Sequence, residues 1–265
     1  MTATSTRPVA SESGTTAAAP PRSVLVIGAT SAIATATARR FAADGARFML
    51  VARSAEHLAA VGDDLRVRGA AGVETYPLDL TDIDGQAGML AAAARALGRI
   101  DVALVAYGTL GDQHASEVSV ETTLREWNTN ATSTIALLTL LGNQFERQGS
   151  GTLVVLSSVA GDRGRRSNYV YGAAKAALST FLSGLRARLS ASGVRVITVK
   201  PGMVDTPMTA HLRKGPLFAT PERVARDIHH AVLHGSDVVY TPRYWRYVML
   251  LIRAMPERIF KRMKF

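Results

Sequence analysis

The sequence contains no cysteine, which excludes disulfides, thiolate zinc sites and cysteine nucleophiles and fits a reducing compartment. Residues 1–22 are rich in Ser, Thr, Ala and Pro but have no apolar run of signal-peptide length, so we expect a disordered tail and no export. The longest apolar cluster near the C-terminal end, residues 247–252, is flanked by arginines and is far too short to span a bilayer. These absences together predict a cytoplasmic protein.

Acidic residues are also in short supply, since 31 Lys and Arg face 21 Asp and Glu, for a formal charge of +10. A basic balance suits nucleic acid, an anionic membrane or an anionic substrate. The sequence has no basic helix-turn-helix pattern and no aromatic platform for RNA, so we expect no nucleic-acid partner. His230 and His234 have the spacing of metal ligands on a helix, yet no carboxylate joins them at ligand spacing. We therefore expect no metal.

The sequence does contain a regular alternation of short aliphatic runs and longer segments rich in Ala and Leu. This alternation predicts α/β class, with one doubly wound Rossmann domain whose mostly parallel sheet of about seven strands is flanked by helices. No internal linker interrupts it, so we expect one domain over residues 23–242, followed by a basic segment at 243–265. The predicted strands are 24–27, 47–51, 73–76, 102–105, 153–156, 194–199 and 238–240.

A nucleotide site is predicted where the first three strands end. The turn Gly28–Ala34 feeds a helix N-terminus that could bind a pyrophosphate, although a plain turn explains one glycine equally well. Arg53 follows the second strand, where a guanidinium suits a 2′-phosphate, so we expect NADP(H) to be preferred and NAD(H) to be the alternative. The candidate cofactor contacts in this half are Gly28, Thr30, Ser31, Ile33, Arg53, Asp79, Leu80 and Gly108.

A chemical site is predicted from a tyrosine and a lysine four residues apart. Tyr171 and Lys175 are neighbours on one helical face, where the ammonium would lower the phenol pKa by favouring phenolate. Ser157 and Ser158 end a strand fourteen and thirteen positions before Tyr171, and either hydroxyl could bond a substrate carbonyl. The turn after the next strand could hold a carboxamide, through Pro201, Gly202, Val204 and Thr206.

The order and spacing of these features resemble the short-chain dehydrogenase/reductase family over residues 23–240. The resemblance implies that Ser158 polarises the carbonyl, that Tyr171 is the general acid and that Lys175 binds nicotinamide ribose and tunes Tyr171. It also implies that Asn130 completes a water-linked proton relay and that Val204 and Thr206 hold the nicotinamide amide.

The chain departs from the family pattern in two places. Two glycines of the nucleotide turn are replaced by Ala32 and Ala34, which puts the phosphate geometry in doubt. The family's Asn-Asn-Ala-Gly is Val105-Ala-Tyr-Gly108 in this chain, which removes an asparagine that stabilises the centre of the sheet. A protein that senses NADP(H) without turnover therefore stays an alternative to an enzyme.

A narrower resemblance, to decaprenylphosphoryl-2-keto-pentose reductases, comes from residues 105–112, 160–171, 245–253 and 259–262. It implies reduction of a lipid-linked 2-keto sugar to polyprenylphosphoryl arabinofuranose, beside an oxidase that makes the ketone. Arg163, Arg165 and Arg166 lie between Ser158 and Tyr171, where they could hold the phosphodiester. An exposed basic loop is the competing interpretation. Another sugar, lipid or small ketone is the alternative substrate.

The basic segment at 243–265 contains seven Lys or Arg residues and one Glu, a formal charge of +6. We expect it to lie on an anionic membrane at the inner face, with its apolar residues in the interface. These apolar residues include Trp245, Leu250, Leu251, Ile252 and Phe260. Burial against a partner subunit is the competing interpretation, and we expect a homo-oligomer.

Overall fold

The computed structural model describes residues 22–263. Residues 1–21 of the predicted tail, which spans residues 1–22, lie outside the described residues. Seven strands form one sheet in the order β3-β2-β1-β4-β5-β6-β7, and every pairing is parallel. All seven predicted strands are confirmed, with bounds that differ by at most two residues at either end. They are β1 Ser23–Ile27, β2 Arg47–Ala52, β3 Gly72–Pro77, β4 Val102–Val105, β5 Gly151–Leu156, β6 Val194–Pro201 and β7 Val238–Thr241.

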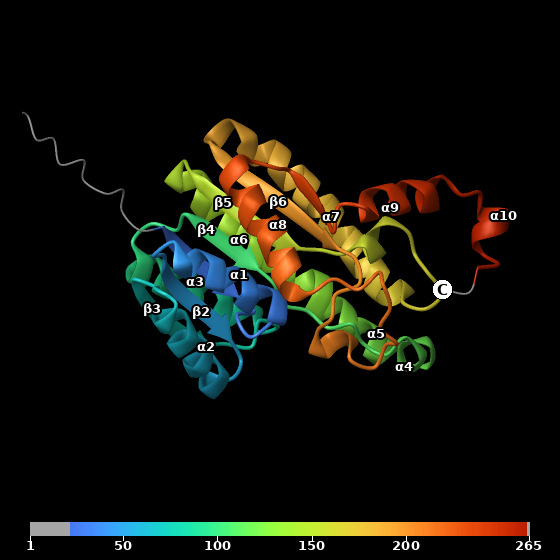
Figure 1. Cartoon of the computed structure of the whole chain (residues 1–265), viewed down its shortest axis with the longest axis horizontal. Coiled ribbons are helices and arrows are strands. Elements are labelled where there is room, and N and C mark those ends of the chain that lie inside the picture. Colours follow the sequence, from blue (N-terminus) through green and yellow to red (C-terminus); the bar gives the residue numbers. More distant parts are fainter. Residues whose placement is uncertain (1–21, 264–265) are drawn as a thin grey trace, which may run out of the picture.

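Helices cover both faces of the sheet, as Figure 1 shows. The helices are α1 Ala32–Ala43, α2 Ala55–Val67, α3 Ile83–Leu97, α4 Gln113–Val118, α5 Val120–Trp127, α6 Ser133–Gln148, α7 Tyr169–Leu189, α8 Pro221–His234, α9 Trp245–Ala254 and α10 Glu257–Phe260. Short turns of other helix types lie at Asn128–Thr132 (π) and at Val159–Asp162, Ser190–Ser192 and Pro207–Thr209 (3-10). The predicted Rossmann architecture is therefore confirmed.

The two faces of the sheet arise from alternation along each strand. In β1, Val24 and Val26 join a core with α1, α2 and α8, whereas Leu25 and Ile27 join a core with α3, α6 and α7. Strand order reverses at β1, which pairs with β2 on one side and β4 on the other. In a doubly wound sheet this reversal opens a crevice at the carboxyl ends of the strands.

The chain after β7 forms α9 and α10, which extend beyond the rest of the domain at the end where α4 and α5 also lie (Figure 1). Trp245 and Met249 pack on Val159 of the turn after β5. Trp245, which we expected from the sequence to enter a membrane interface, is only 4% exposed, so that assignment is wrong. The reason is that residues four apart share one helical face, and that face packs on the protein's own turn.

Candidate active site

A cavity of about 850 Å³ lies at the carboxyl ends of the strands. It brings together residues from eight separate stretches of the chain, and these include every residue predicted to bind cofactor or to act in catalysis. These are Gly28, Thr30, Ser31, Ile33, Arg53, Asp79, Leu80, Gly108, Asn130, Ser158, Tyr171, Lys175, Pro201, Gly202, Val204 and Thr206. Arg163, Arg165 and Arg166 do not line it.

The nucleotide turn is shaped by Gly28, whose φ of 82° favours glycine. A Cβ at this position would lie 2.7 Å from the backbone nitrogen of Tyr107, so the close approach of the β4 end also requires glycine. Ser31 begins α1 without a side-chain capping hydrogen bond, which leaves the first amides of α1 to an external acceptor. The turn thus fits the pyrophosphate of a dinucleotide.

The two alanines of this turn are accommodated in different ways. The methyl group of Ala34 is fully buried in the core on the α1 face, and Ala32 lies at the cavity wall. No residue other than glycine has positive φ in the described part of the chain, so neither alanine strains the backbone. The turn therefore accepts both alanines without a strained backbone conformation.

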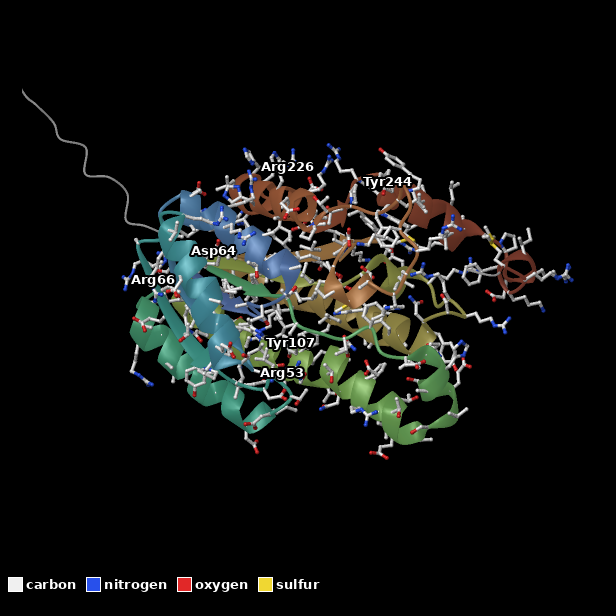
Figure 2. All side chains as sticks on the ribbon, turned by 60° about the horizontal axis from the view of Figure 1, so that its bottom comes forward. Arg53, Asp64, Arg66, Tyr107, Arg226 and Tyr244 are labelled. Atoms are coloured by element: carbon white, nitrogen blue, oxygen red, sulfur yellow. The ribbon has the colours of Figure 1, made fainter. Side chains whose placement is uncertain are left out.

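Arg53 and Asp79 line the cavity beyond the ends of β2 and β3, as does Tyr107, and Figure 2 labels Arg53 and Tyr107. The pKa of Asp79 is lowered chiefly because the amide and hydroxyl of Thr81 donate to its carboxylate, at 3.0 and 2.8 Å, with a further contribution from the charge of Arg53. Asp79 does not cap the helix that follows, since the N-cap of α3 is Asp82, whose carboxylate accepts from the Gly85 amide. The carboxylate of Asp79 is thus fixed at the cavity wall.

Asn130 is fully buried in the π-helical turn that joins α5 to α6. Its Oδ1 accepts from the Thr109 amide at 3.1 Å, and its Nδ2 donates to the Glu126 carbonyl oxygen at 3.1 Å. A Cβ at Gly108 would lie 2.6 Å from this Oδ1 and 3.5 Å from the Lys175 Nζ. The absence of a side chain at Gly108 therefore allows the side chains of Asn130 and Lys175 to approach the same part of the backbone. A π-helical turn often marks a functional site, and the sequence alone did not predict this one.

The two candidate serines have different environments. Ser157 is buried, and its hydroxyl bonds Ser179 at 2.7 Å and the Lys175 carbonyl oxygen at 3.1 Å. Ser158 is partly exposed in the cavity, and its hydroxyl lies close enough to the phenol of Tyr171 to lower the pKa of that phenol. Ser157 thus fixes α7 to β5, whereas Ser158 is the serine placed to meet a ligand.

Tyr171 and Lys175 share the cavity wall, with the lysine Nζ 5.7 Å from the centre of the tyrosine ring. Burial raises the pKa of Tyr171, and the Ser158 hydrogen bond and the charge of Arg165 oppose this rise. Lys175 is 4% exposed and donates to the Leu156 carbonyl oxygen, and its burial lowers its pKa to about 8. The cation that opposes the rise in the Tyr171 pKa is thus Arg165 and not Lys175. The ammonium of Lys175 is turned toward the backbone of β5.

The three arginines of the loop occupy different surroundings. Arg163 donates to the carbonyl oxygens of Ile252 and Met255, at 2.5 and 2.6 Å, and pairs with Glu257 at 2.8 Å. Arg165 is half-buried, and its Nε has no hydrogen-bond partner among residues 22–263. Arg166 is exposed. Of these three arginines, only Arg165 therefore acts electrostatically on the phenol of Tyr171.

A buried network, which the sequence did not predict, joins the loops on the two sides of the cavity. Asp162 pairs with Lys200 at 2.5 Å and accepts from the Tyr240 hydroxyl at 2.8 Å, and the Asp162 side chain is 3% exposed. Burial and this carboxylate raise the pKa of Tyr240 to about 12. The residues are far apart in the sequence, so no local spacing could indicate them.

Comparisons with known proteins identify the family of this chain. A model of the short chain dehydrogenase family matches residues 22–216. An uncharacterized oxidoreductase of Mycobacterium tuberculosis is 40% identical over 248 residues, which cover 94% of this chain and 98% of the relative. One from Streptomyces coelicolor is also 40% identical over 248 residues, or 93% and 98% of the two chains. The chain belongs to the short chain dehydrogenase family and is an NAD(P)-dependent oxidoreductase acting on C=O and CH–OH groups.

Solved structures share the fold. An actinorhodin polyketide ketoreductase with NADPH matches with a TM-score of 0.74 and 24% identity, over 83% of this chain and 95% of that one. A short-chain type dehydrogenase/reductase from Mycobacterium ulcerans has a TM-score of 0.75 and 23% identity, over 92% and 98%. A levodione reductase has a TM-score of 0.74 and 25% identity, over 83% and 95%.

Proposed function

We propose that this protein reduces a ketone to an alcohol with Ser158, Tyr171 and Lys175, and that NADPH is the preferred cofactor. The observation that carries the proposal is the contact between the Ser158 hydroxyl and the Tyr171 phenol, at a cavity wall that also contains the buried ammonium of Lys175. When bound, the cofactor supplies the hydride that reaches the carbonyl carbon. The protein's own residues then have to orient the ketone and supply one proton.

The proton step follows from the positions of the hydroxyl groups. The carbonyl oxygen accepts from the Ser158 hydroxyl, and the Tyr171 hydroxyl gives its proton to the same oxygen as negative charge develops there. The positive charge of Arg165 stabilises the phenolate that this transfer leaves, and the ammonium of Lys175 lies 5.7 Å from the centre of the same ring. Asn130 and Lys175, which both approach Gly108, lie where a water-linked path could return the proton.

The proposed cofactor preference rests on Arg53. It lines the cavity at the end of β2, and Ala52 stands where a carboxylate would bond a ribose 2′-hydroxyl. A guanidinium forms charge-assisted hydrogen bonds with a 2′-phosphate. The fold is shared with a polyketide ketoreductase that has been solved with NADPH, which is consistent with the choice.

We further propose a lipid-linked 2-keto sugar as the substrate, namely a polyprenylphosphoryl 2-keto pentose that is reduced to polyprenylphosphoryl arabinofuranose. The half-buried Arg165 has no counter-ion among residues 22–263, so the phosphodiester of such a substrate would supply one. Asn168 lines the cavity with a buried side-chain oxygen that has no donor in the same range, and a sugar hydroxyl would supply that donor. The ketone itself must come from an oxidase acting on the corresponding alcohol.

The test is turnover with NADPH and NADH on a polyprenylphosphoryl 2-keto pentose, a polyketide-like ketone and a small cyclic diketone. We expect oxidation of NADPH with the lipid-linked sugar at least tenfold faster than with the other two. Faster reduction of an unphosphorylated ketone would leave the reductase chemistry standing and refute the sugar substrate. Tight NADPH binding without turnover on any ketone would favour a cofactor sensor instead.

A further inference from the structure

Helix α9 has apolar residues on two opposite faces. Trp245 and Met249 face the protein and are 4% and 2% exposed. On the outer side, Tyr247, Leu250 and Leu251 are 68%, 64% and 71% exposed. Exposed apolar residues that lie together on one helical face commonly mark an interaction surface, so we expect the outer face of α9 to contact a partner.

The segment that contains α9 and α10 is strongly basic. Between residues 243 and 263 the chain has six basic residues, namely Arg243, Arg246, Arg253, Arg258, Lys261 and Arg262. None of the six has an ion-pair partner among the described residues. The one acidic residue of the segment, Glu257, is paired with Arg163. A partner that binds this outer face must therefore offer both an apolar layer and negative charge.

We propose that this outer face docks on the surface of an anionic lipid bilayer. The exposed side chains of Tyr247, Leu250 and Leu251 enter the interface, and the basic residues around them meet the headgroups. A second copy of the chain is a poorer cover, because a two-fold contact places the same patch on both subunits and would bring two segments of like charge together. No helix among residues 22–263 is long and apolar enough to cross a membrane, so docking is peripheral.

Arg163 fixes the docking surface to the catalytic loop. Its guanidinium binds the two carbonyl oxygens at the end of α9 and the Glu257 carboxylate, and it stacks 3.8 Å from the centre of the Phe260 ring. Arg163 comes five residues after Ser158 and eight before Tyr171. A bilayer bound to α9 therefore lies beside the loop between these two residues, which suits a substrate whose lipid tail stays in the membrane.

The experiment is co-flotation of the full-length protein with vesicles of phosphatidylcholine alone and of phosphatidylcholine with phosphatidylglycerol. We expect partition into the anionic vesicles at low salt, at least tenfold less into the neutral ones, and a loss of binding in high salt. Leu250→Ser with Leu251→Ser should lower partition at least tenfold. The matched control is Val118→Ser with Val120→Ser, a pair that is 88% and 77% exposed on α4 and α5.

Unchanged unfolding temperature and NADPH affinity show that each variant is folded, and neither measurement depends on which ketone is reduced. Equal flotation of the α9 variant and the unmodified protein would overturn the proposal. So would failure of the unmodified protein to float on anionic vesicles at low salt. If the α9 variant instead halves the mass of the protein in lipid-free solution, a second copy is the cover and the bilayer is not.

Discussion

Asp162 and Lys200 form an ion pair that is almost completely buried, with 3% and 13% of their side chains exposed. Asp162 lies in the turn that follows Ser158, and Lys200 comes immediately before Pro201 and Gly202. The pair therefore joins the loop that carries the serine to the loop expected to hold the nicotinamide amide. Tyr240 on β7 donates to the same carboxylate and closes the network.

Removal of Asp162 should destabilise the whole protein. Asp162→Ala leaves the ammonium of Lys200 buried without its partner, which we expect to lower the free energy of unfolding by about 3 kcal/mol in urea titrations. Asp63→Ala is the control, because Asp63 forms an exposed pair with Arg66 and should change stability by less than about 1 kcal/mol. Similar losses for the two variants would contradict the role assigned to the buried pair.

Gly202 should not tolerate a side chain. A Cβ there would lie 1.8 Å from the Trp245 Nε1, so Gly202→Ala must displace either α9 or the loop at the cavity. We expect a tenfold or greater loss of NADPH affinity by fluorescence titration, with a lower unfolding temperature. Gly184→Ala, on α7 with no atom within 4 Å of its Cβ, should be neutral or slightly stabilising. If the Gly202→Ala protein has normal NADPH affinity and stability, the close packing of Trp245 on Gly202 is not required for either property.

Loss of the phenol should separate proton transfer from cofactor binding. Tyr171→Phe should lower kcat by about 10²- to 10⁴-fold with little change in NADPH affinity. Ser158→Ala should mainly lower turnover, and Lys175→Ala should impair turnover and cofactor binding together. Tyr169→Phe, two residues earlier on the same helix and 45% exposed, is the control and should keep normal kcat. Near-normal ketone reduction by Tyr171→Phe would refute the mechanism.

The nucleotide preference should depend on Arg53. Arg53→Ala removes a charge-assisted partner of the 2′-phosphate and should weaken NADPH binding by about tenfold or more, with NADH binding unchanged. Arg40→Ala removes an exposed arginine of α1 that does not line the cavity, so it should leave both affinities as they are. An unmodified protein that binds NADH more tightly than NADPH would contradict the assignment.

The burial of Lys175 should appear in the pH dependence of stability. Its pKa is lowered from 10.5 to about 8, so between these values the unfolded chain holds more protons and the contribution of Lys175 to the free energy of unfolding rises with pH. Below pH 8 the buried ammonium costs on the order of 3 kcal/mol, and this cost fades by pH 10.5. Lys175→Met should therefore stabilise the protein at pH 7.5 more than at pH 10.

Urea titrations at the two pH values give this difference directly. Lys261→Met, at an exposed position on the C-terminal segment, is the control and should show no such change between pH 7.5 and 10. If the free energies of unfolding of Lys175→Met and of the unmodified protein run parallel with pH, the ammonium of Lys175 is not buried in the way described.

The sequence by itself determined the sheet, because alternating strand residues such as Val24 and Leu25 must divide between two cores. It also determined the order of the reacting groups, because Tyr171 and Lys175 lie one helical turn apart. The sequence determined only part of the relationship between Lys175 and Tyr171. The spacing places the two side chains on one helical face, but it does not determine which group the Lys175 ammonium contacts. In the structure it turns to the Leu156 carbonyl oxygen.

Only the tertiary structure decided contacts between distant segments, since these depend on how the loops converge and leave no local pattern. It separated Ser158 from Ser157, whose hydroxyl is taken by α7. It assigned Arg163 to the end of α9 and left Arg165 near Tyr171, although both arginines lie in one basic loop. It also divided the apolar residues of the C-terminal segment, because burial of Trp245 against Gly202 fixes which face of α9 remains outside.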